Sequence, residues 1–298
     1  MTIKSLVIGL GKIGYKYDLK KSGFLSHVKS LDKNKNFSLV GAVEKNSYLR
    51  KGFSKKMNLP AFSNIKESLK KLNPDLIVIA TPLETHFKVT KEICKNNYRN
   101  KILIIEKPVG KNSFETRNIF KLAKKNNVKI YVNYIRQYQN DLIKVFKKIK
   151  SKKFDEVNIN YNRGLRNNAS HLICLLLNIY GKIKKFKILR KHRFSPSFNI
   201  YFKKIVVNFK FKNDLKNIGD IIFKNQNEQI KILKNFKNIY FIKNNKISKI
   251  QKTNMNNYQL NVYQAIFKNV KKKKKILITQ DSVFKTSKLV DNILNYEK

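Results

Sequence analysis

A glycine-rich turn directly follows the first apolar segment, and this pairing constrains the fold more than any other feature of the chain. Residues 3–9 form a short apolar run, and residues 9–14, Gly-Leu-Gly-Lys-Ile-Gly, then fit the pattern G-x-G-x-x-G. In this pattern the first glycine permits a tight turn, the second lets the backbone approach a pyrophosphate, and the third lets a helix pack closely on the strand. The sequence therefore predicts a strand, a phosphate-binding turn and a helix.

Apolar and amphipathic segments alternate through the first third of the chain. The expected strands are 3–9, 37–43, 75–80, 101–105 and 128–132, and the expected helices are 12–34, 64–72, 86–97 and 113–126. Strands that alternate with helices form a parallel sheet with right-handed crossovers. The predicted class is α/β, with an N-terminal Rossmann domain of a doubly wound parallel sheet over residues 1–124.

The pattern changes after about residue 125, where short strand-like segments follow one another. The expected helices are 137–150, 171–180, 256–272 and 280–296, and the expected strands are 157–163, 184–190, 200–211, 219–224, 228–234 and 238–243. Grouped strands favour antiparallel pairing. We therefore expect residues 125–298 to form an α+β domain on a mostly antiparallel open sheet.

An acidic residue ends the second predicted strand. The Glu44 carboxylate can accept hydrogen bonds from both ribose hydroxyls of NAD and repel the 2′-phosphate of NADP, although Lys45 beside it leaves NADP possible. Glu44 lies thirty residues after Gly14, against about twenty in the usual fingerprint. This excess predicts an elongated connection around residues 15–26, where Tyr17, Asp18, Ser26 and His27 are candidates to border the pocket.

The net charge of +48 does not by itself indicate nucleic-acid binding. Only eight of the 66 basic residues are arginine, and the lysines are spread along the whole chain. Nucleic-acid readers use arginine forks and clustered basic faces, so we expect no specific nucleic-acid partner. No apolar run reaches the length of a membrane span. The two cysteines, Cys94 and Cys174, are too few for a disulfide framework, and they do not have the spacing of a zinc site. We therefore expect reduced thiols in a cytoplasmic protein without a bound metal.

Three further motifs stand where predicted strands end. Residues 80–86 read Ala-Thr-Pro-Leu-Glu-Thr-His, residues 106–108 read Glu-Lys-Pro, and residues 133–136 read Asn-Tyr-Ile-Arg. Together with the glycine pattern, they resemble the glucose-fructose oxidoreductase / inositol dehydrogenase family (Gfo/Idh/MocA). The resemblance implies a Rossmann domain that binds a nicotinamide dinucleotide, and a second domain for substrate binding and oligomerisation.

Two residues carry the chemistry that the resemblance implies. The Lys107 ammonium would stabilise negative charge on the reacting oxygen, and Pro108 after it favours a rigid bond that can be cis. His171 would exchange the hydroxyl proton near neutral pH. The family pattern Asp-x-x-x-His has Asn167 at the aspartate position, and Cys174 replaces a second expected aspartate. A surface lysine and a buried structural histidine are the alternatives.

The predicted site divides by role. The catalytic residues are Lys107 and His171. The cofactor-binding residues are Gly9, Gly11, Lys12, Ile13, Gly14, Glu44, Thr81, Pro82, His86, Glu106 and Lys107, although a structural role for His86 is equally open. The substrate-binding candidates are Tyr134, Arg136, Arg163, Asn167 and Asn168. Arg163 and the nearby Arg166 suit a phosphate or carboxylate on the substrate, although these two arginines could instead be surface residues that pair with local acids.

These observations predict an NAD(P)-dependent oxidoreductase that transfers a hydride between a nicotinamide cofactor and a hydroxyl or keto carbon. The resemblance implies a sugar, a sugar derivative or a nucleotide sugar as substrate, and a homo-oligomer. Asn167 and Cys174 motivate an alternative: a catalytically degenerate regulatory protein of the same fold that still binds the dinucleotide.

Overall fold

A computed structural model describes residues 2–96, 98–213 and 219–296, and the chain in it forms two compact units. The first unit comprises Met1–Tyr138 and Asn256–Ile276, and the second comprises Gln139–Met255 and Leu277–Lys298. Each unit therefore contains two separate stretches of the chain. The first unit extends past the expected boundary at residue 124, because the strand that follows this point joins the parallel sheet.

A six-stranded parallel sheet forms the centre of the first unit. Its strands are β1 (Ile3–Ile8), β2 (Phe37–Val43), β3 (Ala61–Phe62), β4 (Leu76–Ile79), β5 (Ile102–Ile105) and β6 (Lys129–Val132), in the order β3-β2-β1-β4-β5-β6. This order is that of a Rossmann sheet and confirms the predicted class. The order reverses between β1 and β4, so the carboxyl ends of these two strands flank the place where such sheets bind ligands.

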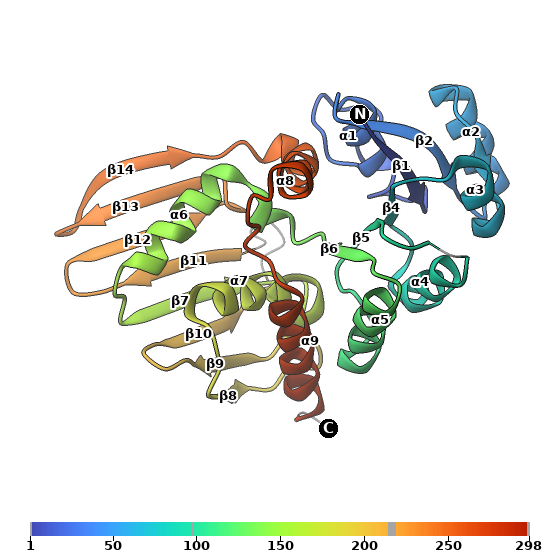
Figure 1. The fold of residues 1–298 in the computed structure, drawn as a ribbon. Coiled ribbons are helices and arrows are strands. Elements are labelled where there is room, and N and C mark those ends of the chain that lie inside the picture. The colour runs from blue at the N-terminus through green and yellow to red at the C-terminus, as the bar shows by residue number, and fades with distance from the viewer. Residues whose placement is uncertain (1, 97, 214–218, 297–298) are drawn as a thin grey trace. The chain divides into compact units, whose positions relative to one another are not determined.

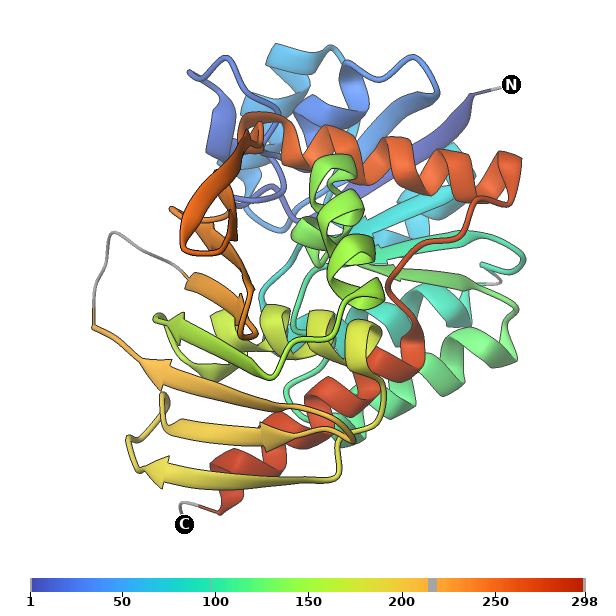
Figure 2. The ribbon, with the colours of Figure 1, turned by 90° about the vertical axis from the view of Figure 1, so that its left-hand side faces the viewer.

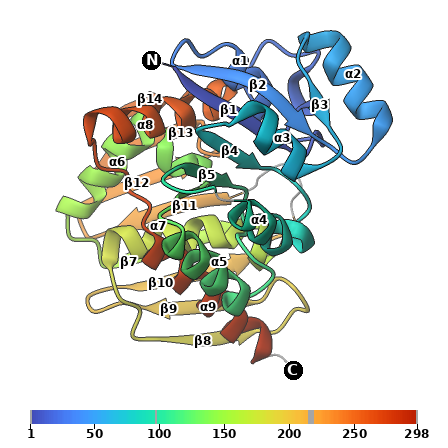
Figure 3. The ribbon, with the colours of Figure 1, turned by 45° about the vertical axis from the view of Figure 1, so that its right-hand side comes forward.

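Helices cover both faces of this sheet. They are α1 (His27–Asp32), α2 (Ser47–Met57), α3 (Ile65–Leu72), α4 (His86–Lys95), α5 (Ser113–Lys125) and α8 (Tyr258–Lys272). Helix α3 contacts α4 and α4 contacts α5, and Figure 3 shows these three following one another in front of the sheet. Helices α1 and α8 contact each other. The Tyr263 ring of α8 packs edge-on against Phe37 of β2, which anchors this late segment in the first unit.

Asparagine side chains begin several helices. Asn46, Asn64 and Asn112 each accept a hydrogen bond from the backbone N–H three residues later, at the starts of α2, α3 and α5. Asn58 and Asn73 end α2 and α3 in the left-handed conformation, which asparagine tolerates better than most residues. The abundant asparagine of this chain therefore has a structural use at helix boundaries.

The helix expected over residues 12–34 is a wrong prediction. Residues 12–26 form turns with a short 3₁₀ helix at Lys16–Asp18, and α1 begins only at His27. The backbone N–H groups of His27 and Val28 donate to the carbonyls of Ile13 and Gly14 at 3.0 and 2.9 Å. The chain thus leaves the helical path after Gly14 and returns to it at His27, and the elongated connection expected at 15–26 lies between.

The second unit is built on an eight-stranded open sheet. Its strands are β7 (Glu156–Tyr161), β8 (Lys185–Arg190), β9 (Ser197–Tyr201), β10 (Val206–Phe211), β11 (Gly219–Lys224), β12 (Glu228–Leu233), β13 (Asn238–Lys243) and β14 (Lys246–Lys252). Figure 1 shows them in the order β14-β13-β12-β11-β7-β10-β9-β8. Only the β7–β10 pair is parallel among the described pairs, so the mostly antiparallel open sheet is confirmed.

Three helices cover this second sheet: α6 (Asn140–Ser151), α7 (Ser170–Tyr180) and α9 (Gln280–Asn295). Helix α7 contacts both α6 and α9, and Figure 2 shows α9 crossing behind the strands β8 to β10. Strand residues alternate between buried and partly exposed, as in β7 and β9. The buried half packs with α6, α7 and α9 in one hydrophobic core.

Candidate cofactor site and active site

The three glycines of the turn after β1 meet different surroundings. Gly9 has φ +98°, and a Cβ there would lie 2.7 Å from the Ala80 carbonyl oxygen. A Cβ at Gly14 would collide with the carbonyl oxygen of Gly9. A Cβ at Gly11 would meet nothing within 4 Å. Packing therefore requires the outer two glycines, whereas the middle one leaves an open approach to the backbone, as binding of a dinucleotide pyrophosphate requires.

The Glu44 carboxylate lies beside this turn. One oxygen accepts a hydrogen bond from the Leu10 backbone N–H at 2.8 Å, and the other accepts from the Asn46 N–H at 3.0 Å. The Lys12 ammonium lies 5.3 Å from the centre of the Tyr17 ring, and that of Lys21 lies 4.8 Å from it. The turn thus has a carboxylate on one strand end and two cations nearby, an arrangement that fits an adenosine ribose and a pyrophosphate.

The Glu-Lys-Pro turn follows β5, and its Lys107–Pro108 peptide bond is cis. His86 holds this turn against the end of β4. Its Nδ1 lies 3.1 Å from the Pro108 carbonyl oxygen, and its Nε2 lies 3.0 Å from that of Thr81. The side chain is buried. Both ring nitrogens therefore contact backbone carbonyls, and these contacts support the structural role for His86 over a cofactor contact.

Glu106 is a nearly buried carboxylate with polar partners. His27 Nε2 lies 2.9 Å from its Oε1, Asn133 Nδ2 donates to the same oxygen, and 13% of its side chain is exposed. Burial alone would raise the pKa of Glu106, but the hydrogen bonds from His27 and Asn133 and the charge of Lys107 lower it below its usual value. Glu106 is therefore an anion at neutral pH.

Lys107 and Arg136 place two positive charges in the same region. Burial lowers the pKa of Lys107, the Glu106 charge raises it, and the Arg136 charge lowers it further. Burial alone lowers the pKa of Arg136 to about 10. The Arg136 guanidinium therefore carries its charge at neutral pH. The partly buried Lys107 ammonium and the buried Arg136 guanidinium are suited to hold an oxygen on which negative charge develops.

In the second unit, the predicted residues lie on the segment that leads into α7. Arg163 and Gly164 have φ values of +55° and +84°, and a π-helical turn, Leu165–Ala169, follows them. His171 lies in the first turn of α7 and is 7% exposed. Asn167 is exposed, whereas Asn168 is buried and donates to Asn162 Oδ1 at 3.4 Å.

Two side chains of this segment make contacts with α9. Arg166 forms an ion pair with Asp291 at 2.9 Å, so this arginine pairs with a local acid. Cys174 is fully buried, and its Sγ lies 3.7 Å from the Ser282 hydroxyl oxygen. The position where the resemblance leads one to expect a second aspartate is therefore part of the contact between α7 and α9, and a carboxylate there would be buried.

The first unit brings most of the predicted cofactor residues to the carboxyl edge of one sheet. The glycine turn, Glu44, the Thr81–His86 segment and Lys107 all follow strand ends there. Tyr134 and Arg136 follow β6 at the same edge, and both are buried. Arg163, Asn167, Asn168 and His171 belong to the second unit.

Sequence reasoning did not select Gln259 and Tyr263, which contact His27 of the first unit. They lie more than 230 residues away along the chain, on a helix that was expected to belong to the second domain. The apolar spacing of this helix gives no sign of the polar contacts that it makes.

Comparison with known proteins identifies the first unit. Residues 3–134 match the sequence model of a family described as "Oxidoreductase family, NAD-binding Rossmann fold". Residues 3–134 belong to the Gfo/Idh/MocA oxidoreductase family. The family resemblance is thereby confirmed, and with it an NAD-binding oxidoreductase fold. No curated protein matches the sequence.

Solved structures are similar over the full chain. A dehydrogenase (MviM) from Clostridium difficile has a TM-score of 0.80 at 17% identity, covering 99% of this chain and 100% of its own. UDP-N-acetylglucosamine 3-dehydrogenase from Acidithiobacillus ferrooxidans has a TM-score of 0.81 at 11% identity, and the match covers 100% of this chain and 98% of the dehydrogenase. A super-repressor mutant of Gal80p from Saccharomyces cerevisiae has a TM-score of 0.84 at 12% identity, and the match covers 100% of this chain and 96% of Gal80p. At these identities the likeness shows the fold alone.

None of the described helices has both the length and the apolar character needed to cross a membrane. Among the same residues, no group of three or more His, Cys, Asp and Glu side chains could hold a metal ion.

Proposed function

We propose that this chain is an NAD(P)-dependent oxidoreductase acting on a CH–OH group of a sugar, a sugar derivative or a nucleotide sugar. The observation that carries the proposal is one sheet edge with two features. The backbone at Gly11 after β1 is open to a ligand, and the cations Lys107 and Arg136 follow β5 and β6, two and three strands away. A dinucleotide site and a charge-stabilising site at one edge suit hydride transfer to a carbonyl carbon or from a CH–OH carbon.

The chain's own residues have distinct roles in this proposal. When bound, NAD supplies or accepts the hydride. Gly9, Gly11 and Gly14 shape its pyrophosphate site, and Glu44 holds its ribose and disfavours the 2′-phosphate of NADP. The Lys107 ammonium holds the reacting oxygen and, with Arg136, stabilises negative charge on it. His171 takes the hydroxyl proton on a ring nitrogen during oxidation and returns it during reduction.

The substrate class follows from charge. Arg136 and Lys107 are two cations against one nearby anion, Glu106, and the net charge of the chain is +48. A positive field favours anionic ligands, so we place nucleotide sugars first among the candidates. The structural likeness to a UDP-N-acetylglucosamine dehydrogenase is consistent with this choice. The proposal includes a cytoplasmic homo-oligomer, and both cysteines are buried free thiols, as a reducing compartment permits.

The test is a turnover screen. Purified protein with NAD⁺ or NADP⁺ is incubated with sugars and nucleotide sugars, and absorbance at the reduced-nicotinamide band is followed. We expect turnover with at least one nucleotide sugar and a loss of about 10²- to 10³-fold in Lys107→Met, the size expected for removal of one charge-stabilising donor. Lys111→Met, on the exposed ion pair with Glu115, should leave turnover unchanged. Equal turnover in both variants would contradict the role of Lys107.

A regulatory protein that binds the dinucleotide without turnover is the second candidate. Asn167 and Cys174 favour it, because neither residue supplies the carboxylate that the family resemblance leads one to expect. In the same screen, saturable nucleotide binding with no turnover on any substrate would support this candidate over the enzyme.

A further inference from the structure

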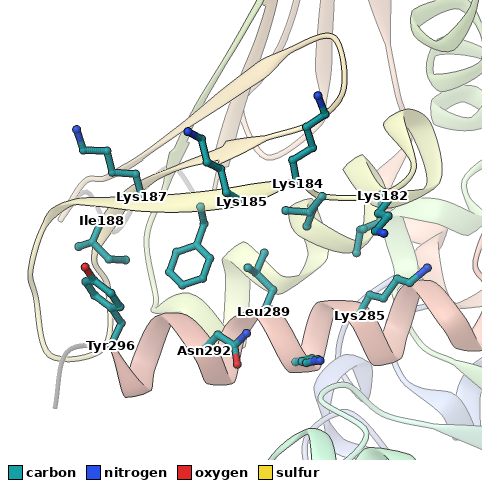
Figure 4. Close-up of a pocket in the computed structure, with 13 residues that line it drawn as sticks. Lys182, Lys184, Lys185, Lys187, Ile188, Lys285, Leu289, Asn292 and Tyr296 are labelled. Carbon is teal, nitrogen blue, oxygen red and sulfur yellow. The ribbon is translucent and has the colours of Figure 1, made fainter.

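A cavity of about 730 Å³ lies in the second unit between strand β8 and helix α9 (Figure 4). We refer to it as the β8–α9 cavity. We propose that it binds an anionic amphiphile, a long-chain fatty acid whose carboxylate lies beside Lys182 and Lys285 and whose chain runs toward Tyr296. None of the described residues that line the cavity belongs to the proposed cofactor site or active site. The inference therefore goes beyond the proposed function and does not depend on it.

Strand β8 presents an apolar face to α9. Successive side chains of a strand point to opposite sides of the sheet, and Lys185 and Lys187 point away from α9 (Figure 4). The Lys185 ammonium lies 5.0 Å from the centre of the Tyr201 ring on the neighbouring strand. Phe186 and Ile188 therefore face α9, and both are only partly buried. Because β8 is the last strand at its end of the sheet, no further described strand covers this face.

Helix α9 forms the opposite wall with one of its faces. Four residues at helical spacing on this face line the cavity: Lys285, Leu289, Asn292 and Tyr296. The chemistry changes along this line, from a cation through an aliphatic residue and an amide to an aromatic ring. The Tyr296 and Phe186 rings meet edge-on, with their centroids 6.1 Å apart. At 1.5 Å per residue, the line from the first to the last of these four residues is about 16 Å long.

The cations of the cavity gather at one of its ends. Figure 4 shows Lys182 and Lys285 at the end away from Ile188 and Tyr296. The described lining residues include six lysines but no Asp or Glu. Lys285 pairs with Asp281 one turn earlier on the helix, but both residues are exposed. Such a surface pair contributes little stability, so a ligand carboxylate can replace Asp281 as the partner of Lys285.

The separation of charged and apolar groups decides the class of ligand. Ligand pockets have volumes of about 300–1,000 Å³ and mostly apolar walls with a few placed polar groups, and this cavity fits that description. A sugar phosphate would pair with the lysines but would leave the apolar walls at Phe186, Ile188 and Leu289 uncovered. A neutral apolar compound would cover the walls and leave the ammonium groups without a partner. A fatty acid satisfies both ends.

A second copy of the chain is a less suitable occupant. Its apolar side chains could cover the same walls, but each copy has a net charge of +48. Contact at a lysine-lined cavity would bring like charges together, which disfavours association. Charge complementarity therefore favours a small anion over a copy of this chain.

The first experiment is a calorimetric titration of the purified protein with sodium dodecanoate below its micelle concentration, without nucleotide or sugar. We expect saturable binding of one dodecanoate per chain. Affinity for decanoate and octanoate should fall by about two- to fourfold for each CH₂ removed, the upper value being that of full burial. Butanoate and the cation dodecyltrimethylammonium should not bind. Equal affinity for octanoate and dodecanoate, or for dodecanoate and the cation, would overturn the proposal.

Two double variants with the same net charge locate the carboxylate. Lys182→Met with Lys285→Met removes the cations at the proposed end, and dodecanoate affinity should fall by about ten- to thirtyfold, as expected for lost hydrogen bonds to a charged group. Lys185→Met with Lys187→Met removes two cations that point away from α9, and affinity should change by less than about twofold. Equal losses in the two variants would show that the overall charge binds the anion, and would overturn the proposal.

A second pair of variants locates the chain. Ile188→Glu places a carboxylate on an apolar wall and should weaken dodecanoate binding by at least about tenfold. Leu189→Glu is the control, because Leu189 is 52% exposed and is not among the lining residues, so binding should be unchanged. If circular dichroism shows that Ile188→Glu does not fold, Tyr296→Glu at the exposed helix end tests the same part of the cavity. Undiminished binding by the folded variant would overturn the proposal.

Sedimentation velocity distinguishes the ligand from a second copy. We expect the same sedimentation coefficient for the wild type, for the wild type with dodecanoate and for Ile188→Glu. A wild type that binds no dodecanoate and that loses a dimer in Ile188→Glu would show that the cavity is an interface between copies, and would overturn the proposal.

Discussion

Glu106 and Lys107 are adjacent, oppositely charged and largely removed from water, so the protonation state of each depends on the other. Burial disfavours both charges, and their mutual attraction restores part of what burial removes. Arg136 acts in the opposite sense on Lys107. The site is therefore balanced by three charges, and substitutions of its members should move the pH dependence of catalysis in opposite directions.

The first prediction concerns that pH dependence. Lys107 acts in its protonated form, and its pKa in the folded protein is below the ordinary 10.5. Activity should therefore be present at lower pH and be lost as the pH rises through a midpoint below 10.5. Glu106→Gln removes the charge that raises the pKa and should move the midpoint down. Arg136→Gln removes a like charge and should move it up.

The measurement is log kcat/KM against pH for the substrate found in the turnover screen. A shift in the same direction for both variants, or in neither, would contradict the assignment of Lys107 as the titrating acid.

Among single residues, those that lie in short motifs after strands could be predicted from the sequence. Lys107, Glu106 and the glycines are found from local patterns, and the cis bond before Pro108 is confirmed. The partners of Glu106 could not be found in this way, because His27 lies 79 residues from it along the chain. The same holds for Gln259, which lies 126 residues from its contact Asn133. The residues next to Gln259 in the sequence do not indicate a contact with a residue that is distant along the chain.

Among the elements, the connection between Gly14 and His27 differs most from expectation. Asp18 organises it: the buried carboxylate accepts hydrogen bonds from the Leu25 and Ser26 N–H groups at 2.6 and 3.0 Å and from the Ser26 hydroxyl at 2.5 Å. The apolar spacing over residues 12–34 suggests one helix. The helix is interrupted because these side-chain contacts satisfy the backbone in a folded loop instead.

The second prediction follows from this loop. Asp18→Ala leaves two partly or fully buried N–H groups and a hydroxyl without their acceptor, so the free energy of unfolding should fall by about 2–4 kcal/mol. Asp32→Ala is the control, because Asp32 pairs with Lys33 at the surface and its loss should cost less than about 1 kcal/mol. Urea denaturation followed by circular dichroism measures both. Equal, small losses would show that Asp18 does not hold the loop.

Several elements of the fold were missed by sequence reasoning for physical reasons. Helix α2 buries a single side chain, Phe53, so its apolar stripe is too weak to recognise. Strand β3 has only two residues, and β14 is almost entirely exposed, so neither shows strand alternation. The strand expected over 200–211 is two strands, β9 and β10, joined by a turn. Elements with a buried face were predictable, and those without one were not.

In the whole molecule, each compact unit draws on two stretches of the chain. Helix α8 belongs to the first unit, although the strands before it and helix α9 after it belong to the second. Sequence reasoning placed 256–272 in the second domain, because neighbouring segments usually share a domain. The apolar residues that hold α8, such as Tyr263 against Phe37, look the same in sequence whichever sheet they meet.

The second unit also contains the β8–α9 cavity (Figure 4). Ile188 lies opposite Tyr296 at one end of it, whereas Lys185 and Lys187 point away from α9. No residue of the proposed site lines this cavity. We therefore expect substitutions at Leu289 to change the stability of the second unit and not nucleotide binding.

The account depends most directly on dinucleotide binding at the glycine turn. The decisive measurement is a fluorescence titration of the purified protein with NADH and with NADPH, repeated for Gly11→Trp and Gly52→Trp. A Cβ at either glycine would meet nothing within 4 Å, so both variants should fold, but only Gly11 is in the proposed pyrophosphate site. We predict saturable NADH binding at micromolar concentrations in the wild type and in Gly52→Trp, weaker NADPH binding, and loss of both in Gly11→Trp. Absence of binding by the wild type, or undiminished binding by Gly11→Trp, would contradict the account.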